Sequence, residues 1–119
     1  HVNLGMLSMK LGKDADAEAS FRAAIEVDPK YADAHLNLGV LLEKLGKYAD
    51  AEASYRAAIR IDPKHANAHY NLGNLLAAVR KDYDGAEAMY RKVIELDPEH
   101  AEAHKYNYNL ELVLKAKKG

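Results

Sequence analysis

The fold is decided by the stretch NLGVLLEKLGKYADAEASYRAAIRIDPK, residues 37–64, because most of the chain consists of copies of it. Residues 3–30 repeat this stretch at a shift of 34, and most positions are identical. A third copy spans residues 71–99 with one extra residue, so prolines stand at positions 29, 63 and 98; a fourth begins at residue 101 and fades. A fixed period of about 20 to 50 residues indicates a stack of similar structural units.

Each copy contains two amphipathic helix patterns separated by a turn. In the central copy, apolar residues recur at three- and four-residue steps, first at Leu38, Leu41, Leu42 and Leu45, then at Ala51, Tyr55, Ala58 and Ile59. An Asp-Pro pair closes each second helix, because proline disfavours helical geometry in the preceding residue. We predict first helices near 1–11, 31–45, 65–79 and 99–116, and second helices near 15–27, 49–61 and 84–96.

Small residues recur where the two helices of a pair are expected to meet. A glycine inside a helix costs about 1 kcal/mol relative to alanine, so its recurrence implies a packing reason. We predict that the glycines of the first helices let a facing helix approach closely, and that aromatic residues of the second helices fill the space between. The glycines are Gly5, Gly39 and Gly73, and the aromatic residues are Phe21, Tyr55 and Tyr90.

The turn inside each pair differs between copies. Gly46 is suited to the left-handed residue that ends a helix. The third copy lacks this glycine and reads VRKDY at residues 79–83, so we predict a longer turn there.

The period of 34, the pair Leu38-Gly39, the Gly46-Lys47-Tyr48 turn and Pro63 together resemble the tetratricopeptide repeat. The resemblance implies an all-α fold: a right-handed superhelix of about three helix-turn-helix repeats plus a C-terminal capping helix. We expect one domain over residues 1–119, with repeats at about 1–31, 32–65 and 66–100 and the capping helix at 101–117. Lys115, Lys117 and Lys118 would complement the dipole of that last helix. Its register stays open, because Tyr106-Asn107 and Tyr108-Asn109 both resemble Tyr70-Asn71.

The resemblance also implies that first helices line a concave groove for a bound peptide. An amide offers both a donor and an acceptor, which suits a peptide main chain. Asn3, Asn37 and Asn71 occupy the same position of successive repeats, and this column is similar to the row of asparagines in O-linked N-acetylglucosamine transferases and kinesin light chains. The expected contact residues form three columns: Asn3, Asn37 and Asn71; Val2, Leu36 and Tyr70; Met6, Val40 and Asn74. The alternative is that the asparagines bond between helices or face water, and that the apolar residues are packing residues.

One binding mode of similar proteins, a clamp for a terminal carboxylate, needs two asparagines and three basic residues. The corresponding positions hold Val2, Met6, Asn37, Asn67 and Asn71, or one repeat later Leu36, Val40, Asn71, Glu102 and Tyr106. Neither set contains Lys or Arg to pair with a carboxylate, so we predict no such clamp.

Composition argues against other functions. The net charge is −1 from 17 basic and 18 acidic residues, which gives no general attraction for nucleic acid or an anionic membrane. The chain has no Cys, and we expect a soluble, cytoplasmic protein. His1, His35, His69 and His104 lie about one repeat apart, so we predict no metal site; we also expect no cofactor and no catalysis.

The favoured hypothesis is a protein-interaction module that binds an extended or partly helical peptide in the groove. The alternative is a structural or engineered repeat scaffold, a fragment of a longer superhelix, that stacks or self-associates. Reading of RNA by one repeat per base is a third option, against which the balanced charge argues.

Overall fold

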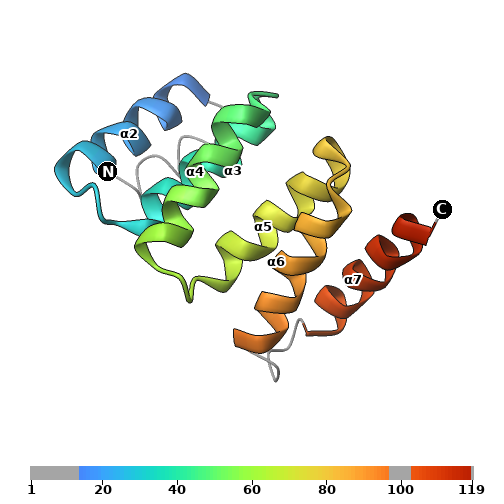
Figure 1. The fold of residues 1–119 in the computed structure, drawn as a ribbon. Coiled ribbons are helices and arrows are strands. Elements are labelled where there is room, and N and C mark those ends of the chain that lie inside the picture. The colour runs from blue at the N-terminus through green and yellow to red at the C-terminus, as the bar shows by residue number, and fades with distance from the viewer. Residues whose placement is uncertain (1–13, 97–102, 119) are drawn as a thin grey trace. The chain divides into compact units, whose positions relative to one another are not determined.

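The computed structural model of the chain describes residues 14–96 and 103–118, and all regular structure in these ranges is helical. The elements are α2 (Asp14–Val27), α3 (Ala32–Lys44), α4 (Tyr48–Ile61), α5 (Ala66–Leu75), the π-helical turn η1 (Leu76–Arg80), α6 (Tyr83–Leu96) and α7 (Ala103–Lys118) (Figure 1). These ranges confirm the all-α prediction and, within a few residues, the predicted helices from residue 15 onward. The helix predicted near 1–11 lies outside the described residues.

The chain divides into two compact units, residues His1–Pro63 and Lys64–Gly119. The boundary falls at the Asp62-Pro63 pair, between the second and third repeats. The single domain over residues 1–119 stays a prediction.

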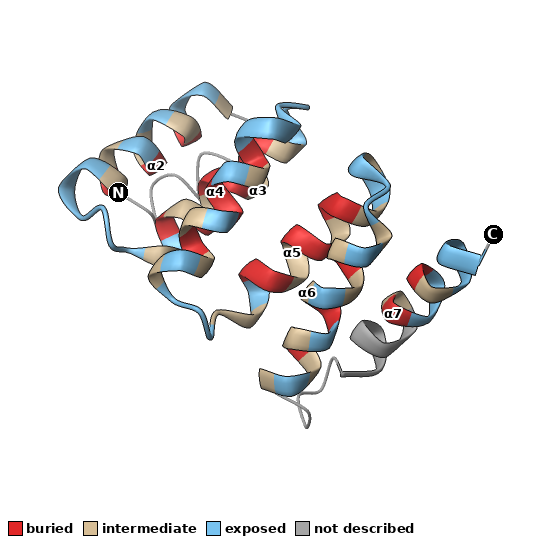
Figure 2. Ribbon diagram, viewed as in Figure 1, coloured by how far each residue is buried: buried red, intermediate tan, exposed pale blue. Residues whose placement is uncertain are grey.

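In the first unit, α3 and α4 form a hairpin and α2 packs against α3. The buried residues lie on the helix faces that meet (Figure 2). Phe21 of α2, Leu41 of α3 and Tyr55 of α4 are almost completely buried. Burial of such side chains is the main stabilising term of a helical hairpin.

The second unit repeats this plan with α5 and α6 as the hairpin and α7 packed against α6. Leu72 and Leu75 of α5 and Val93 of α6 are fully buried. From α7, Leu110 and Val113 are buried, whereas Leu112 remains 47% exposed. The predicted capping helix therefore covers α6 with one face and leaves an apolar side chain on another.

Gly39 and Gly73 confirm the predicted close approach of the two helices, and each lies against a tyrosine ring; Gly5 lies outside the described residues. A Cβ atom on Gly39 would lie 2.6 Å from Cε1 of Tyr55, and one on Gly73 would lie 2.9 Å from Cε1 of Tyr90. Both distances are shorter than a carbon–carbon contact allows. The glycine is therefore required for the close approach of each helix pair.

The turn of the third repeat differs from our prediction. Gly46 has φ 79°, as expected, and Lys81 adopts the equivalent left-handed conformation with φ 56°. The extra residue does not lengthen the turn but is absorbed by η1 at the end of the first helix. The backbone N–H of Lys47 donates to Leu42 O at 2.8 Å, and that of Asp82 donates to Leu76 O at 2.9 Å, one residue further back. A one-residue insertion within a helix commonly takes this π-helical form.

Lysines form ion pairs across the seams between successive hairpins. Lys47 Nζ lies 3.7 Å from Glu18 Oε1 where α2 meets the next hairpin, and Lys117 Nζ lies 2.8 Å from Glu87 Oε1 where α6 meets α7. Glu18 and Glu87 occupy the same repeat position. Lys117, which we expected only to complement the helix dipole, thus also joins α7 to α6.

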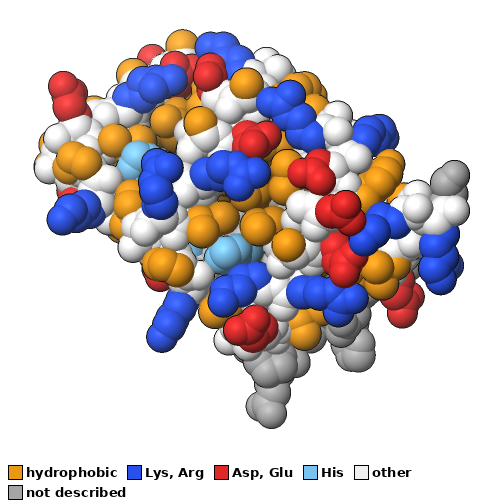
Figure 3. Space-filling view, in the orientation of Figure 1, with side chains coloured by type: hydrophobic (Ala, Val, Ile, Leu, Met, Phe, Trp, Pro, Cys, Tyr) orange, Lys and Arg blue, Asp and Glu red, His pale blue; other side chains and the backbone are white. Residues whose placement is uncertain are grey.

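The surface carries both signs of charge. On the face drawn in Figure 3, Lys and Arg side chains are interspersed with Asp and Glu. This pattern agrees with the balanced composition. In the part of the chain that the structure describes, no helix is both long and apolar enough to cross a membrane.

Candidate functional site

An open pocket of about 340 Å³ lies in the second unit, among α5, η1, α6 and α7. Its lining is Asn74, Ala77, Ala78, Tyr83, Tyr90, Asn109, Leu112, Val113 and Ala116. None of these side chains is charged, and the only polar groups are two amides and two phenols. A concave, mostly apolar site with a few polar groups is the usual form of a binding site.

The turn η1 supplies one wall of this pocket through Ala77 and Ala78. Ala77 stands four residues after Gly73, and Glu43 stands four residues after Gly39 in the preceding repeat. The third repeat thus has a methyl group where the second has a carboxylate. Together with the wider π-helical backbone, this difference leaves space beside Tyr90.

Hydrogen bonds connect the pocket's polar side chains. The hydroxyl of Tyr90 donates to Asn74 Oδ1. Asn109 Nδ2 donates to the hydroxyl of Tyr70 at 3.0 Å and to Asn74 Oδ1 at 3.5 Å. The rings of Tyr70 and Tyr90 lie with their centroids 6.1 Å apart at an angle of 51°. Helices α5, α6 and α7 are therefore joined by one network.

The environment of Tyr90 keeps its hydroxyl protonated. Burial, with a smaller contribution from Tyr70, raises the pKa of Tyr90 to about 12. A protonated hydroxyl can donate a hydrogen bond, and that of Tyr90 donates to the carbonyl oxygen of Asn74. The amide of Asn74 then directs its nitrogen elsewhere.

In the second repeat, the hydroxyl of the buried tyrosine has a different hydrogen-bond partner. The hydroxyl of Tyr55 donates to Glu43 Oε1 at 2.8 Å. Burial and then this hydrogen bond raise the pKa of Tyr55 above its ordinary value. Val40 stands at the position of Asn74. The polar partner of the tyrosine has therefore moved by one helical turn between the two repeats.

The structure places the predicted contact residues in different surroundings. Val2, Asn3 and Met6 lie outside the described residues. Leu36 is buried at 9% exposure, while Asn37 and Val40 are half-buried on α3. On α5, Asn74 lines the pocket and Tyr70 joins its network through Asn109. Asn71 is half-buried and does not line the pocket.

The two central asparagines have side chains available for a ligand. Within residues 14–96 and 103–118, neither Asn37 nor Asn71 forms a side-chain hydrogen bond. The bonding of asparagines between helices, which we considered as the alternative, is found instead at Asn74 and Asn109. Whether Asn37 and Asn71 contact a peptide stays a prediction.

Sequence reasoning missed most of the pocket. Ala77, Ala78, Leu112 and Val113 were not predicted, and Asn109 appeared only as an uncertainty of register. The available signal was the change from Glu43-Lys44 to Ala77-Ala78, which removes two charges from a first helix next to the inserted residue.

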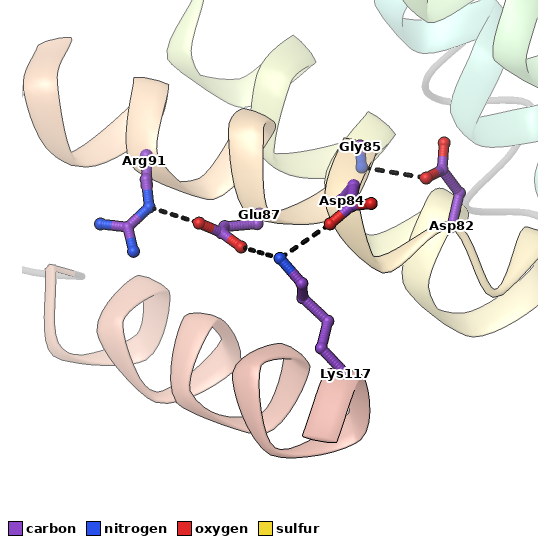
Figure 4. A network of polar contacts seen from close by, with 6 residues as sticks. All are labelled: Asp82, Asp84, Gly85, Glu87, Arg91 and Lys117. Atoms are coloured by element: carbon purple, nitrogen blue, oxygen red, sulfur yellow. Dashed lines mark hydrogen bonds and ion pairs between the residues drawn. The ribbon is translucent and has the colours of Figure 1, made fainter. Parts of the chain in front are cut away.

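Charged residues beside the pocket neutralise one another (Figure 4). Lys117 Nζ lies 2.7 Å from Asp84 Oδ1 and 2.8 Å from Glu87 Oε1, and Arg91 Nε lies 2.9 Å from Glu87 Oε2. Hydrogen bonds from Lys117 and then Arg91 lower the pKa of Glu87. The hydrogen bonds that Lys117 donates to Asp84 and then to Glu87 raise the pKa of Lys117. Both shifts favour the charged forms of Glu87 and Lys117 at neutral pH.

The histidines have structural surroundings in the residues described. His65 Nδ1 accepts a hydrogen bond from the N–H of Ala68 at 3.3 Å at the start of α5. His35 Nε2 lies 3.0 Å from the carbonyl oxygen of Pro29, and His69 is buried. Among the described residues, no group of three or more His, Cys, Asp or Glu side chains is placed to hold a metal ion.

Comparisons with known proteins agree with this architecture. The family model described as tetratricopeptide repeat matches residues 2–66 and 42–101. No curated protein matches the sequence significantly.

Solved structures are similar over nearly the whole chain. The first TPR domain of Spaghetti (RPAP3), bound to an HSP90 peptide, has a TM-score of 0.88 at 24% identity, covering 99% of this chain and 93% of that one. PcrH in complex with the chaperone-binding region of PopD has a TM-score of 0.87 at 26% identity, covering 97% and 89%. The O-GlcNAc transferase of Thermobaculum terrenum has a TM-score of 0.80 at 26% identity, covering 95% of this chain and 21% of that one.

Proposed function

We propose, from the premise that this chain belongs to the tetratricopeptide repeat family, that it is an interaction module which binds an extended or partly helical peptide segment. The proposed binding surface is formed by the first helices of the hairpins. Its contacts are Asn3, Asn37 and Asn71, with Val2, Met6, Leu36, Val40, Tyr70 and Asn74. The partner is a protein or peptide, and the chain performs no chemistry on it.

The observation that carries this proposal is the set of amides on α3 and α5. Asn37 and Asn71 are half-buried, and neither has a side-chain partner within the described ranges. An amide held on a rigid helix can donate to one main-chain carbonyl and accept from a main-chain N–H, whatever the side chains of the peptide. The similar structure of PcrH, which is in complex with the chaperone-binding region of PopD, supports the binding of a protein segment here.

The choice of a protein partner over a nucleic acid or a membrane rests on charge. Ion pairs such as Lys44–Asp14 and Arg56–Glu52 neutralise basic side chains locally. Binding of nucleic acid or anionic lipid draws its affinity from unpaired basic groups that meet phosphates.

The test uses a displayed library of random linear peptides selected on the full chain. The double variant Asn37→Ala with Asn71→Ala should bind the selected peptides at least about ten-fold more weakly, because each lost amide removes hydrogen bonds to the main chain. Its melting temperature should stay close to that of the parent chain. Equal binding by variant and parent would count against the proposal.

Ser20→Ala is a matched control. Ser20 is a neutral polar residue, half-buried on the second helix α2, and is not one of the proposed contacts. This variant should bind as the parent does. A large loss of stability in the asparagine variant would instead support a purely structural role for the two side chains.

A further inference from the structure

We propose that the pocket among α5, η1, α6 and α7 is a specificity subsite, which receives one large uncharged apolar side chain of the bound peptide while Asn74 and Asn109 bond to the adjacent main chain. This inference rests on the proposed function and adds to it the chemistry of the ligand and the residues that select it.

The lining determines the class of side chain. Walls of Ala77, Ala78, Leu112 and Val113 offer only methyl and methylene contacts. Moving a charged group from water into such surroundings without a partner is strongly unfavourable. The volume of about 340 Å³ leaves room for a branched aliphatic or an aromatic side chain.

The charges beside the pocket point to the same class of ligand. Lys117 is held between Asp84 and Glu87, and Glu87 is also paired with Arg91. These groups compensate one another, so they exert little net attraction on an acidic or a basic side chain. A neutral side chain matches both the pocket and its surroundings.

The internal network leaves a donor and an acceptor for the peptide backbone. Asn74 uses Oδ1 to accept from Tyr90 and Asn109, and Asn109 uses Nδ2 to donate to Tyr70 and Asn74. Within the described parts of the chain, Asn74 Nδ2 and Asn109 Oδ1 are not used in these bonds. A peptide unit has one carbonyl oxygen and one N–H, which are the groups that complement this donor and acceptor.

Substitutions close to the inserted residue create this arrangement. In the second repeat, Glu43 bonds to Tyr55 and Val40 stands at the position of Asn74. In the third, Asn74 takes over the tyrosine hydroxyl, so no carboxylate is required at Ala77. The subsite is therefore built from local substitutions next to η1.

The experiment compares two variants in which an alanine of the pocket wall is replaced by a larger residue. Ala78 is exposed, so Ala78→Leu should fold and occupy the pocket. Ala77→Glu introduces the residue of the second repeat and a charge. Peptides selected from the random library on the full chain are then measured with each variant by fluorescence polarisation, together with peptides in which each residue in turn is replaced by Ala.

We expect one apolar peptide residue whose replacement by Ala weakens binding to the parent chain by about ten-fold or more. The same replacement should have little effect with Ala78→Leu or Ala77→Glu, because their pocket is already filled. Ala88→Leu is the matched control, since Ala88 is exposed on α6 and does not line the pocket. In Ala88→Leu, replacement of the apolar peptide residue by Ala should weaken binding as much as it does in the parent chain.

A wild-type measurement covers the case of a variant that fails to fold. Methyl NMR signals of Ala77 and Ala78 should shift on addition of the selected peptide. The subsite is refuted if these signals do not move, or if the two variants bind every peptide as the parent does. When the Asn37 and Asn71 double variant nevertheless loses binding, the proposed function stands without the subsite. When no peptide is selected at all, both proposals are wrong.

Discussion

The hairpins α3–α4 and α5–α6 share one packing rule and differ in the way they end. In both, a glycine of the first helix lies against a tyrosine ring of the second. The first ends α3 with Gly46 in the left-handed conformation, whereas the second ends with the π-helical turn η1 and Lys81. The tyrosine hydroxyl bonds to Glu43 in one and to Asn74 in the other.

This comparison shows that the residues which pack the two helices together and the residues which vary in chemistry occupy different positions of the repeat. The contact of glycine with tyrosine fixes the distance between the helices and tolerates no side chain. The residues one turn further along can change without altering that distance. A pocket can therefore arise in one hairpin while the other keeps a carboxylate at the same place.

The largest effect should come from replacing the packing glycines. Gly39→Ala places a Cβ 2.6 Å from Cε1 of Tyr55, and Gly73→Ala places one 2.9 Å from Cε1 of Tyr90. We expect Gly39→Ala to lower the free energy of unfolding by about 1–3 kcal/mol, despite the better helix propensity of alanine. Gly73→Ala should cost less. Urea denaturation measures both, and a greater loss at Gly73 would contradict the shared rule.

Next in size is the exchange of the two left-handed residues. Gly46→Ala should destabilise the chain by about 1–2 kcal/mol, because a Cβ is unfavourable at φ 79°. Lys81→Gly should stabilise it by about 0.5–1 kcal/mol through relief of the same strain. Thermal unfolding, monitored by circular dichroism, measures the stability of both variants. Shifts of equal sign would show that η1 does not impose the conformation of Lys81.

The tyrosine hydroxyls should give a smaller difference. Tyr90→Phe should cost about 0.5–1.5 kcal/mol, because Asn74 Oδ1 loses its donor and keeps only the 3.5 Å contact with Asn109. Tyr55→Phe should cost less, since water can reach the half-buried carboxylate of Glu43. Hydrogen exchange should also quicken in α7 with Tyr90→Phe. No change in α7 would argue that the network does not hold this helix.

The smallest effect concerns the ion pairs of Lys117. The pKa of Glu87 is lowered, so its contribution to stability is present above the unfolded pKa of about 4.3 and is lost as pH falls through the folded pKa. The pKa of Lys117 is raised, so its contribution is present below about 10.4 and is lost as pH rises through the folded value.

Lys117→Met should therefore lower the urea midpoint slightly near neutral pH. The difference from the parent should shrink in acid, in strong alkali and at high salt. Lys118→Met, which alters an exposed lysine of the same helix, is the control. A difference that is constant with pH and salt would show that Lys117 acts through packing of its methylene groups.

Much of the fold could be predicted from the sequence because its signals are repeated. The Asp-Pro pairs and the leucine steps set the described helices to within a few residues. The glycines predicted a close approach of the two helices, which the structure shows as contacts of Gly39 with Tyr55 and of Gly73 with Tyr90. The place of the inserted residue could not be read in this way, because a turn and a π-helical segment can both absorb one residue. The missing glycine favoured the wrong choice.

The candidate site was predictable only in part. Repeat columns identified Tyr70 and Asn74, which the structure brings together through Asn109. Asn109 lies on a helix whose register the sequence left open. Ala77 and Ala78 carry no chemical group, and their role depends on space that only the three-dimensional arrangement of η1 and α7 defines.

The lysine–glutamate pairs at the seams have a consequence for growth of the array. Glu18 and Glu87 lie near the start of second helices, and each faces a lysine that follows in the sequence, Lys47 and Lys117 respectively. At both of these junctions the earlier helix presents the carboxylate and the later segment presents the lysine. An added module would be favoured slightly in the same orientation, because a reversed module would set like charges against each other.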